Sequence, residues 1–317
     1  MVQPSNRYPI GLEQVAAFLR ERGWRVGPTI SPIAHGEWSR AFSFVVEDGA
    51  EYVVRFSMLD EDFRKDQVAA RYATPALPIP RVLELGQVFD GFYAISERAR
   101  GAFIDALDAR QLRRALPSLC AAIDGMRQAD VSASTGFGVW DASGQAPHAS
   151  WRDALLAIGT DATGSRIAGW RPRLEQSPTG AEPFDTAFGR LVKLTAEVPN
   201  TRHLIHADLL NYNVLIDGER VSAVLDWGAA MYGDWVFDVA WFVFWQPWYP
   251  AWSGIDFAAE AARYFTSMGV DVSDFRARMR CCEIAIGLDN QAYCAFKGDS
   301  RWPQLEAVAR RTIELSA

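Results

Sequence analysis

Apolar residues in the first part of the chain recur first with a helical period and then with the two-residue period of strands. Residues 11–23 carry apolar side chains on one helical face and end at Gly23, a residue typical of a helix C-cap. Asp48-Gly49 predicts a hairpin turn. Runs rich in β-branched and aromatic residues, which favour strands, lie at 41–47, 52–56, 82–88 and 92–97.

One helix is predicted inside this strand-rich part. Polar and apolar positions from 62 to 73 have helical spacing, and the proline-rich stretch 75–80 ends the helix. We therefore predict a small, mainly antiparallel sheet with one inserted helix.

Beyond residue 98 the pattern becomes helical. Two loops rich in glycine and proline, 132–149 and 160–182, are predicted as surface insertions. The sequence predicts an α+β protein with an N-terminal lobe over 1–98 and a mainly helical C-terminal lobe over 99–317. The segments with helical period are 105–128, 150–159, 183–197, 235–246, 256–268, 274–296 and 303–315.

Composition and charge restrict the class of partner. The 317-residue chain is 49% hydrophobic and 22% charged, enough to form a core without metals or cross-links. Its formal net charge is −7 and it has no basic stripe, so we expect no nucleic-acid partner. Residues 201–317 hold 15 acidic and 10 basic residues. This surplus would attract a cationic ligand, although an acidic solvated surface would produce the same count.

The cysteines have neither the spacing of metal ligands nor the density of a disulfide scaffold. They are Cys120, Cys281, Cys282 and Cys294. The first residues lack an export signal, and no segment approaches 18 uninterrupted apolar residues. We therefore expect a cytoplasmic protein with reduced thiols and no membrane partner. Nothing in the sequence bears on its oligomeric state.

One strand signal stands inside the helical part. Residues 213–216 and 221–225 have the pattern of two strands joined by an Asp-Gly turn. The motif H-x-D-x4-N precedes this hairpin, from His206 to Asn213, and Asp226 follows it. By itself the motif also fits an ordinary loop. The hairpin, the second aspartate and the upstream sheet together indicate a kinase-like site.

Phosphoryl transfer needs a carboxylate that accepts the proton of the attacking hydroxyl, and hard oxygen ligands that hold Mg²⁺. Asp208 is the predicted base, and Asn213 and Asp226 are the predicted Mg²⁺ ligands. His206 is predicted to brace the loop rather than carry a proton, because Asp208 already fills the role of base.

These segments resemble the aminoglycoside phosphotransferase and choline kinase superfamily. RHLIHADLLNYNVL at 202–215 and AVLDWGAAMYGD at 223–234 match the superfamily's catalytic segments. SRAFSF at 39–44 and FWQPW at 244–248 are similar to its hygromycin B phosphotransferases. The resemblance runs through nearly the whole chain, with further matching stretches at 52–56, 76–86, 135–138 and 286–289.

The resemblance implies a protein-kinase-like fold with two lobes. It also implies Mg²⁺-dependent transfer of the γ-phosphoryl group of ATP or GTP to an aminoglycoside. Hygromycin B, a cationic antibiotic, is the favoured acceptor, with its 4-hydroxyl as the site and resistance as the biological result.

The nucleotide side departs from the superfamily pattern. No G-x-G-x-x-G loop is present, and the turn at 34–39 holds only Gly36, so phosphate contacts would fall to backbone N–H groups and the Ser39 hydroxyl. Arg55 stands where the superfamily has Lys; it can clamp phosphate oxygens, with Asp66 as its expected partner. The backbone groups expected to pair with the adenine edge belong to Glu97 and Ala99.

On the acceptor side, the resemblance implies a carboxylate-lined cleft between the catalytic loop and the C-terminal helices. Each candidate has an ordinary alternative, because tryptophans at this spacing also form cores and helix carboxylates are usually solvated. Asp238 matches the superfamily residue that braces the catalytic loop. The acceptor candidates are Asn211, Asp234, Trp245, Trp248, Glu283 and Asp289.

Two other functions stay open at this point. One is phosphorylation of another aminoglycoside, a macrolide or an amino alcohol by an enzyme of the same superfamily. The other is a catalytically silent pseudokinase that binds nucleotide, which Arg55 and the glycine-poor turn favour and Asp208, Asn213 and Asp226 oppose. A protein kinase fits less well, because no A-P-E segment follows Asp226.

Overall fold

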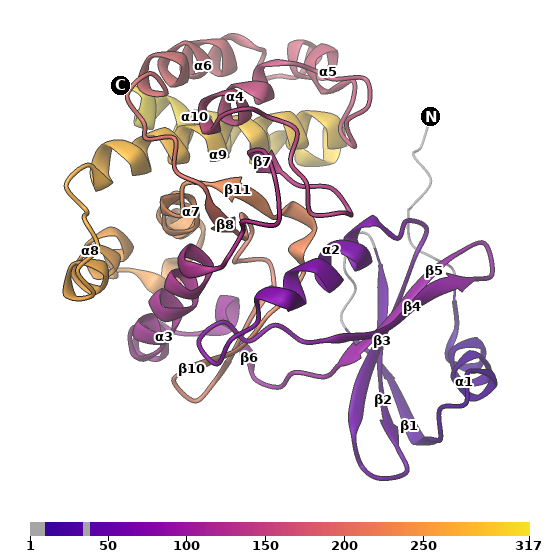
Figure 1. The fold of residues 1–317 in the computed structure, drawn as a ribbon. Coiled ribbons are helices and arrows are strands. Elements are labelled where there is room, and N and C mark those ends of the chain that lie inside the picture. Colours follow the sequence, from indigo (N-terminus) through magenta and orange to yellow (C-terminus); the bar gives the residue numbers. More distant parts are fainter. Residues whose placement is uncertain (1–9, 34–38) are drawn as a thin grey trace.

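A five-stranded antiparallel sheet forms the smaller of two lobes, with strands in the order β1-β2-β3-β5-β4 (Figure 1). The structure, a computed structural model, describes residues 10–33 and 39–317; the predicted turn with Gly36 lies outside the described residues, except for Ser39. The strands are β1 (Val26–Pro32), β2 (Arg40–Val46), β3 (Glu51–Ser57), β4 (Val82–Val88) and β5 (Gly91–Glu97).

Helix α1 (Leu12–Glu21) closes one face of this sheet. Its buried residues Phe18 and Leu19 lie in one apolar cluster with Phe42, Phe56 and Tyr93 of the strands. The ring of Phe18 meets Tyr93 edge to face, with centroids 4.7 Å apart. Each fully buried side chain of this size contributes about 1.5–3 kcal/mol, so α1 is an integral part of the lobe.

The alternation along β3 sends its side chains to two different environments. Val54 and Phe56 are buried in the cluster under α1. Arg55 lies between Ala41 and Ala94 on the neighbouring strands and faces the opposite side, toward the larger lobe. The alternation of side chains along β3 therefore places the guanidinium of Arg55 in the space between the lobes.

Helix α2 (Glu61–Ala69) connects β3 to β4 and continues as a 3₁₀ turn, Ala70–Tyr72. The predicted helix at 62–73 is therefore confirmed. Figure 1 shows α2 between the sheet and the larger lobe, where it packs on the short 3₁₀ helix Trp227–Ala229.

The larger lobe is mainly helical and is organised around α9, which packs against α5, α6, α7 and α10. Every residue from Cys281 to Leu288 is buried, which agrees with a helix surrounded on most sides. The helices are α3 (Ala109–Gln128), α4 (Trp151–Leu156), α5 (Trp170–Gln176), α6 (Glu182–Leu194), α7 (Val236–Trp245), α8 (Phe257–Ser267), α9 (Phe275–Lys297) and α10 (Trp302–Ser316).

Two small sheets lie inside this helical lobe. The predicted hairpin is present, but it is not isolated, because its first strand also pairs with β6 in the order β10-β9-β6. A second sheet has the order β7-β11-β8. The strands are β6 (Ala102–Phe103), β7 (Gly138–Val139), β8 (His203–Ile205), β9 (Val214–Asp217), β10 (Arg220–Val224) and β11 (Met231–Gly233).

The prediction that 132–149 and 160–182 are surface insertions is wrong. The segment 160–182 contains α5, whose Trp170 and Leu174 are buried in the main core. The segment 132–149 contributes β7 to a sheet. Strand β1 was also missed, because its glycine and prolines hide the strand pattern; prolines are tolerated there because β1 is an edge strand.

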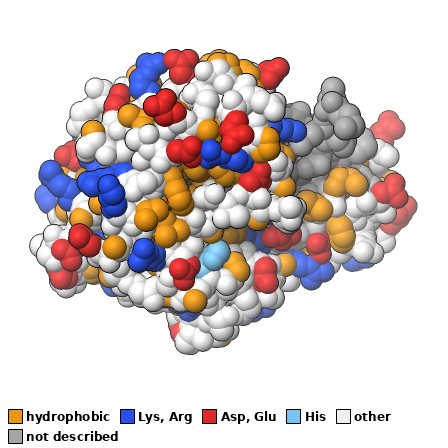
Figure 2. All heavy atoms as spheres, turned by 90° about the horizontal axis from the view of Figure 1, so that it is seen from above, with side chains coloured by type: hydrophobic (Ala, Val, Ile, Leu, Met, Phe, Trp, Pro, Cys, Tyr) orange, Lys and Arg blue, Asp and Glu red, His pale blue; other side chains and the backbone are white. Residues whose placement is uncertain are grey.

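One face of the molecule carries charges of both signs. On the face shown in Figure 2, Lys and Arg side chains are interspersed with Asp and Glu, and no broad basic patch forms. Within the described residues, no helix combines the length and the apolar character needed to cross a bilayer. The division between residues 98 and 99 stays a prediction; the five-stranded sheet ends at Glu97 and the next strand belongs to a different sheet.

A pair of glycine substitutions tests how tightly the second small sheet is packed. A Cβ on Gly233 of β11 would lie 2.2 Å from the Trp151 ring, so Gly233→Ala forces a buried indole to move. We expect a loss of about 1–3 kcal/mol in the free energy of unfolding. Gly189 is exposed on α6 with nothing within 4 Å of its added Cβ, so Gly189→Ala should gain about 0.5–1 kcal/mol. Denaturant unfolding measures both; equal changes in the two variants would contradict this packing.

Candidate active site

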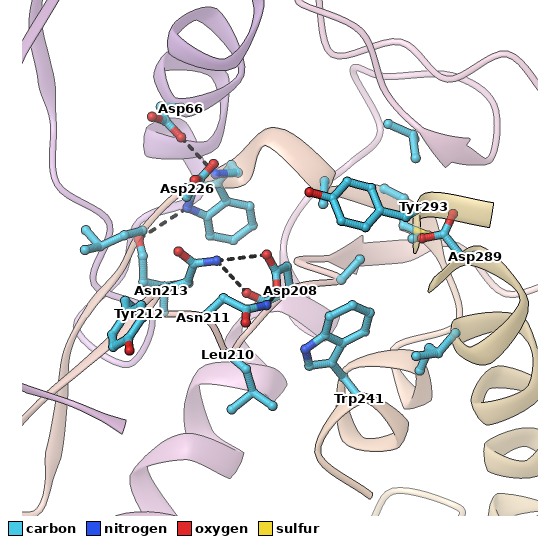
Figure 3. A pocket seen from close by; sticks show the side chains of 18 of the residues that line it. Asp66, Asp208, Leu210, Asn211, Tyr212, Asn213, Asp226, Trp241, Asp289 and Tyr293 are labelled. Atoms are coloured by element: carbon cyan, nitrogen blue, oxygen red, sulfur yellow. Dashed lines mark hydrogen bonds between the residues drawn. The ribbon is translucent and has the colours of Figure 1, made fainter. Parts of the chain in front are cut away.

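One large cavity of about 1890 Å³ lies between the two lobes. Residues from β3 and from the end of β5 line it on one side. The loop after β8, the segment after β10 and helices α7 and α9 line it on the other. Figure 3 shows that Asp208, Asn213 and Asp226 approach one another there.

The loop that carries Asp208 is held in place by hydrogen bonds to Asp238 of α7. The buried carboxylate of Asp238 accepts the N–H of His206 at 2.9 Å and that of Ala207 at 2.8 Å. Burial raises the pKa of Asp238 to about 7. Ala207, which stands where the superfamily usually has Gly, is left-handed with φ +63°. The bracing predicted for Asp238 is therefore present as two hydrogen bonds.

His206 is fully buried and joins two parts of the site. Its Nδ1 accepts the N–H of Asp208 at 3.2 Å, so its Nε2 carries the hydrogen that is donated to the carbonyl of Leu225 at 2.8 Å. Burial lowers the pKa of His206 to about 4, so the ring is neutral. The ring links the Asp208 loop to the strand that ends before Asp226.

Two amides surround the Asp208 carboxylate (Figure 3). Asn211 Nδ2 donates to Oδ1 at 2.7 Å and Asn213 Nδ2 donates to Oδ2 at 3.1 Å. Burial raises the pKa of Asp208 to about 8 against these hydrogen bonds, and the charge of Asp226 adds to the rise. The group can therefore take up a proton near neutral pH.

Asn213 and Asp226 form a donor set suited to a hard cation. Asn213 Nδ2 is used on the carbonyl of Asp208, at 2.9 Å, and on its carboxylate, which leaves Asn213 Oδ1 as a free acceptor. Asp226 is exposed to the cavity, where desolvation and then the charge of Asp66 raise its pKa to about 6, and Arg55 opposes the rise. The described residues contain no cluster of three or more His, Cys, Asp or Glu side chains able to hold a metal. One carboxylate and one amide oxygen fit Mg²⁺, which takes its other ligands from water and phosphate.

Helix α2 ties the smaller lobe to the segment that carries Asp226. Asp66 forms an ion pair with Arg55, as the sequence predicted, and its other oxygen accepts the N–H of Trp227 at 2.9 Å. The neighbouring Lys65 is buried and donates to the carbonyl of Gly228 at 2.5 Å. Consecutive residues of α2 therefore hold backbone groups of Trp227 and Gly228, the two residues that follow Asp226.

The remaining nucleotide-side candidates line the same cavity. Ser39, Glu97 and Ala99 are all on its wall. The Glu97 carboxylate is occupied by Arg81 at 2.9 Å, which lowers the pKa of Glu97. The Glu97 N–H also donates to the carbonyl of Arg81, at 3.1 Å, so the carbonyl oxygen of Glu97 is the group left to face a ligand.

A second group of predicted residues lines the cavity beyond Asp208. Asn211, Trp245, Trp248 and Asp289 are on this wall. Asp289 has no ion-pair or hydrogen-bond partner in the described chain. The residue is exposed to the cavity, and desolvation by the surrounding wall raises the pKa of its carboxyl to about 6. An unpaired carboxylate in such a place is suited to an ammonium group.

Comparison with known proteins places this geometry in a family. A model of the phosphotransferase enzyme family matches residues 29–277. The chain belongs to this family. It is 33% identical over 285 residues to the hygromycin-B 4-O-kinase of Escherichia coli, covering 88% of this chain and 80% of that protein.

Solved structures agree with the family and the fold. A ternary complex of a thermostable mutant of aminoglycoside phosphotransferase APH(4)-Ia with AMP-PNP and hygromycin B matches with a TM-score of 0.81 and 31% identity. That match covers 96% of this chain and 99% of the other. An amicoumacin kinase, at 13% identity and a TM-score of 0.65 over 96% of each chain, shares the fold alone. The protein-kinase-like, two-lobed fold predicted for this phosphotransferase is confirmed.

Two of the predicted acceptor residues do not reach the cavity of this phosphotransferase. Asp234 is buried and is held bidentately by Arg278, at 2.7 and 2.6 Å. Glu283 is buried on another face of α9, near Arg311 at 3.8 Å. Helical spacing placed Glu283 and Asp289 on one helix, but only Asp289 lies on the face that lines the cavity. Both Asp234 and Glu283 are therefore removed from the acceptor site.

The structure also adds residues that sequence reasoning missed. Trp241 lines the cavity one turn before Trp245, and both indole N–H groups lack a hydrogen-bond partner in the structure. Tyr293 extends the same wall one turn after Asp289 (Figure 3). Helical spacing from Trp245 and Asp289 could have found Trp241 and Tyr293. Asp105 and Lys65 gave no signal, because each acts through a residue more than a hundred positions away.

Two bidentate Arg–Asp pairs test the correction at Asp234. Asp234→Ala leaves the buried guanidinium of Arg278 unpaired, so we expect the free energy of unfolding to fall by about 3–5 kcal/mol. Asp185→Ala breaks an equally bidentate pair with Arg171, but on the surface, and should cost at most about 1 kcal/mol. Urea unfolding measures both. A stable Asp234→Ala protein with a raised Michaelis constant for the acceptor would return Asp234 to the site.

Proposed function

We propose that this phosphotransferase moves the γ-phosphoryl group of ATP or GTP onto a hydroxyl of an aminoglycoside, with hygromycin B as the favoured acceptor. One observation carries the proposal: Asp208, Asn213 and Asp226 converge in a cavity whose far wall presents the unpaired Asp289. The named relatives, a hygromycin-B 4-O-kinase and APH(4)-Ia, support the choice of acceptor.

Asp208 acts as the base in this proposal. Its carboxylate orients the acceptor hydroxyl and takes its proton while the hydroxyl oxygen forms a bond to the γ-phosphorus. The bond between the γ-phosphorus and the bridging oxygen breaks, and the nucleoside diphosphate leaves. Asn211 and Asn213 hold the carboxylate in place through their amides. The raised pKa of Asp208 suits a group that must hold the proton after transfer.

The smaller lobe holds the nucleotide in this proposal. Arg55 clamps phosphate oxygens while Asp66 orients its guanidinium, and the Ser39 hydroxyl adds a donor. The backbone of Glu97 and Ala99 pairs with the adenine edge. Mg²⁺ held by Asn213 and Asp226 would neutralise the charge on the transferred phosphoryl group.

The acceptor lies against the larger lobe in this proposal. Hygromycin B is a polycation, and its ammonium groups must find partners when they leave water. Asp289 is a carboxylate available for one of them, and Trp241, Trp245 and Trp248 offer flat walls to a sugar or a cation. We place the protein in the cytoplasm, where its four buried, free thiols would stay reduced.

The acceptor and the base can be tested in one experiment. Expression in a susceptible bacterium should raise tolerance to hygromycin B, and Asp208→Ala should remove the protection. With purified protein, Asp208→Ala should lower kcat by about 10²–10⁴, because the general base is lost, and leave nucleotide affinity nearly intact. Phosphate incorporation is measured on a panel of aminoglycosides, a macrolide and an amino alcohol. Transfer to any of these but not to hygromycin B would reject the named acceptor.

Asp289 and Asp274 provide a matched pair for the acceptor wall. Asp289→Asn should raise the Michaelis constant for the drug and leave that for the nucleotide unchanged. Asp274 lies at the far end of the same helix, outside the cavity, so Asp274→Asn should change neither constant. Similar behaviour of the two variants would remove Asp289 from the acceptor wall.

The metal site predicts a distinct signature. Asp226→Asn should weaken nucleotide binding at saturating Mg²⁺ by about tenfold or more, the cost of one charge-assisted contact of about 1.5–3 kcal/mol. Without Mg²⁺, the variant should bind nucleotide at least as tightly as the wild type, because a negative charge beside the phosphates is removed. Titration calorimetry across Mg²⁺ concentrations measures this dependence. A variant that keeps the wild-type dependence would exclude Asp226 as a ligand.

A further inference from the structure

We propose that Asp105 is a positioning residue that holds the catalytic loop in its active shape; the inference rests on the proposed phosphoryl transfer. Asp105 lies in the 3₁₀ turn Ile104–Ala106, more than a hundred residues before the loop. Its carboxylate accepts the N–H of Asn211 at 2.9 Å and the N–H of Tyr212 at 3.0 Å.

These two N–H groups belong to the most unusual backbone of the loop. Asn211 has φ +60° and Tyr212 has φ +69°, so two successive non-glycine residues are left-handed. This conformation crowds the side chain against the backbone and persists only where neighbouring groups impose it. A carboxylate that binds both successive N–H groups is such a group, because it fixes the orientation of two peptide planes at once.

The braced residues act directly on the base. Asn211 Nδ2 donates to the Asp208 carboxylate at 2.7 Å, and Asn213, which follows Tyr212, donates to the same carboxylate. If residues 211 and 212 relaxed to a right-handed conformation, both amides would leave Asp208. Asp105 therefore determines the position of the base without contacting it through a hydrogen bond.

Asp105 is itself held on two sides. The turn follows β6, whose Phe103 pairs with Leu215 of β9, the strand that begins after Asn213. On the other side, the Tyr249 hydroxyl donates to Asp105 Oδ1 at 2.8 Å, and the Tyr249 ring stacks on Trp252 with centroids 4.0 Å apart. Asp105 is thus held both by the sheet that contains the hairpin β9–β10 and by the segment that follows α7.

Two other carboxylates in the molecule show the same arrangement. Asp238 accepts the N–H of left-handed Ala207 and the N–H of His206 before it. Asp66 accepts the N–H of Trp227, the residue after left-handed Asp226. With Asp105 included, each left-handed non-glycine residue of the site has a carboxylate that accepts either its own N–H or the N–H of the next residue.

Asp105→Asn keeps the size of the side chain but leaves one acceptor oxygen in place of two. We expect kcat to fall by about 10- to 100-fold through misplacement of the base. The Michaelis constant for nucleotide should stay within about twofold, because Arg55, Ser39 and the Glu97 backbone come from the other lobe. Asp108→Asn is the matched control: Asp108 lies three residues further on, caps α3 through Gln111, and should leave both constants unchanged.

Hydrogen exchange provides a measure that does not depend on activity. The amides of Asn211 and Tyr212 should exchange faster in Asp105→Asn than in the wild type, and at wild-type rates in Asp108→Asn. If Asp105→Asn does not fold, Asp105→Glu, which displaces the carboxylate by one methylene, should give the same loss of kcat and faster exchange.

The outcomes separate the brace from the proposed function. A wild-type protein that transfers no phosphoryl group rejects the function and leaves the exchange rates to decide the brace. In an active protein, an unchanged kcat in Asp105→Asn overturns the inference, and so do unchanged exchange rates. A nucleotide Michaelis constant that rises as much as kcat falls also overturns it, because a general structural defect would then explain the loss.

Discussion

The site depends on left-handed backbone at residues that are not glycine. Ala207, Asn211, Tyr212 and Asp226 all have φ between +58° and +69°. Left-handed backbone costs about 1–2 kcal/mol at Ala207 and Tyr212 and less at Asn211 and Asp226, because short polar side chains tolerate it. A hydrogen bond to a charged group returns about 1.5–3 kcal/mol. Asp238, Asp105 and Asp66 supply those bonds. The tight turns that aim Asp208, Asn213 and Asp226 into one cavity therefore exist because carboxylates hold the peptide groups beside them; Asp238 and Asp66 are buried and Asp105 is half-buried.

The same carboxylates give the cavity its electrostatic character. Asp208 and Asp226 have raised pKa values because burial and neighbouring negative charge both oppose ionisation. Arg55 is the cation that offsets this on the nucleotide side, and Asp289 has no partner on the other. A metal ion and a cationic acceptor would each offset part of this excess negative charge. The arrangement of charges therefore favours the binding of both.

Ion pairs and hydrogen bonds connect the two lobes, and the geometry of the site depends on both. Arg55 on β3 pairs with Asp66 on α2, and Asp66 binds the segment beside Asp226. Lys65 adds a second bond to the same segment. The position of the Asp226 carboxylate therefore depends on how the sheet and α2 sit against the larger lobe. Arg166 adds a surface link, since it pairs with Glu61 and Asp62 at the start of α2.

The sequence by itself determined the features that depend on near neighbours in the chain. Local periodicity predicts the strands at 41–47 and 52–56 and the long helices, and turn chemistry predicts the hairpin with its Asp-Gly turn. The spacing from His206 to Asp226 is likewise read directly along the chain. Arg55 and Asp66 could be paired because they come from adjacent elements. What only the tertiary structure decided is which side chains share a space. Asp234 meets Arg278, Glu283 turns away from the cavity while Asp289 faces it, Trp170 is buried, and Asp105 meets a loop across the fold. The physical reason is that burial and hydrogen bonding of these groups depend on the packing of distant segments, which no local pattern encodes.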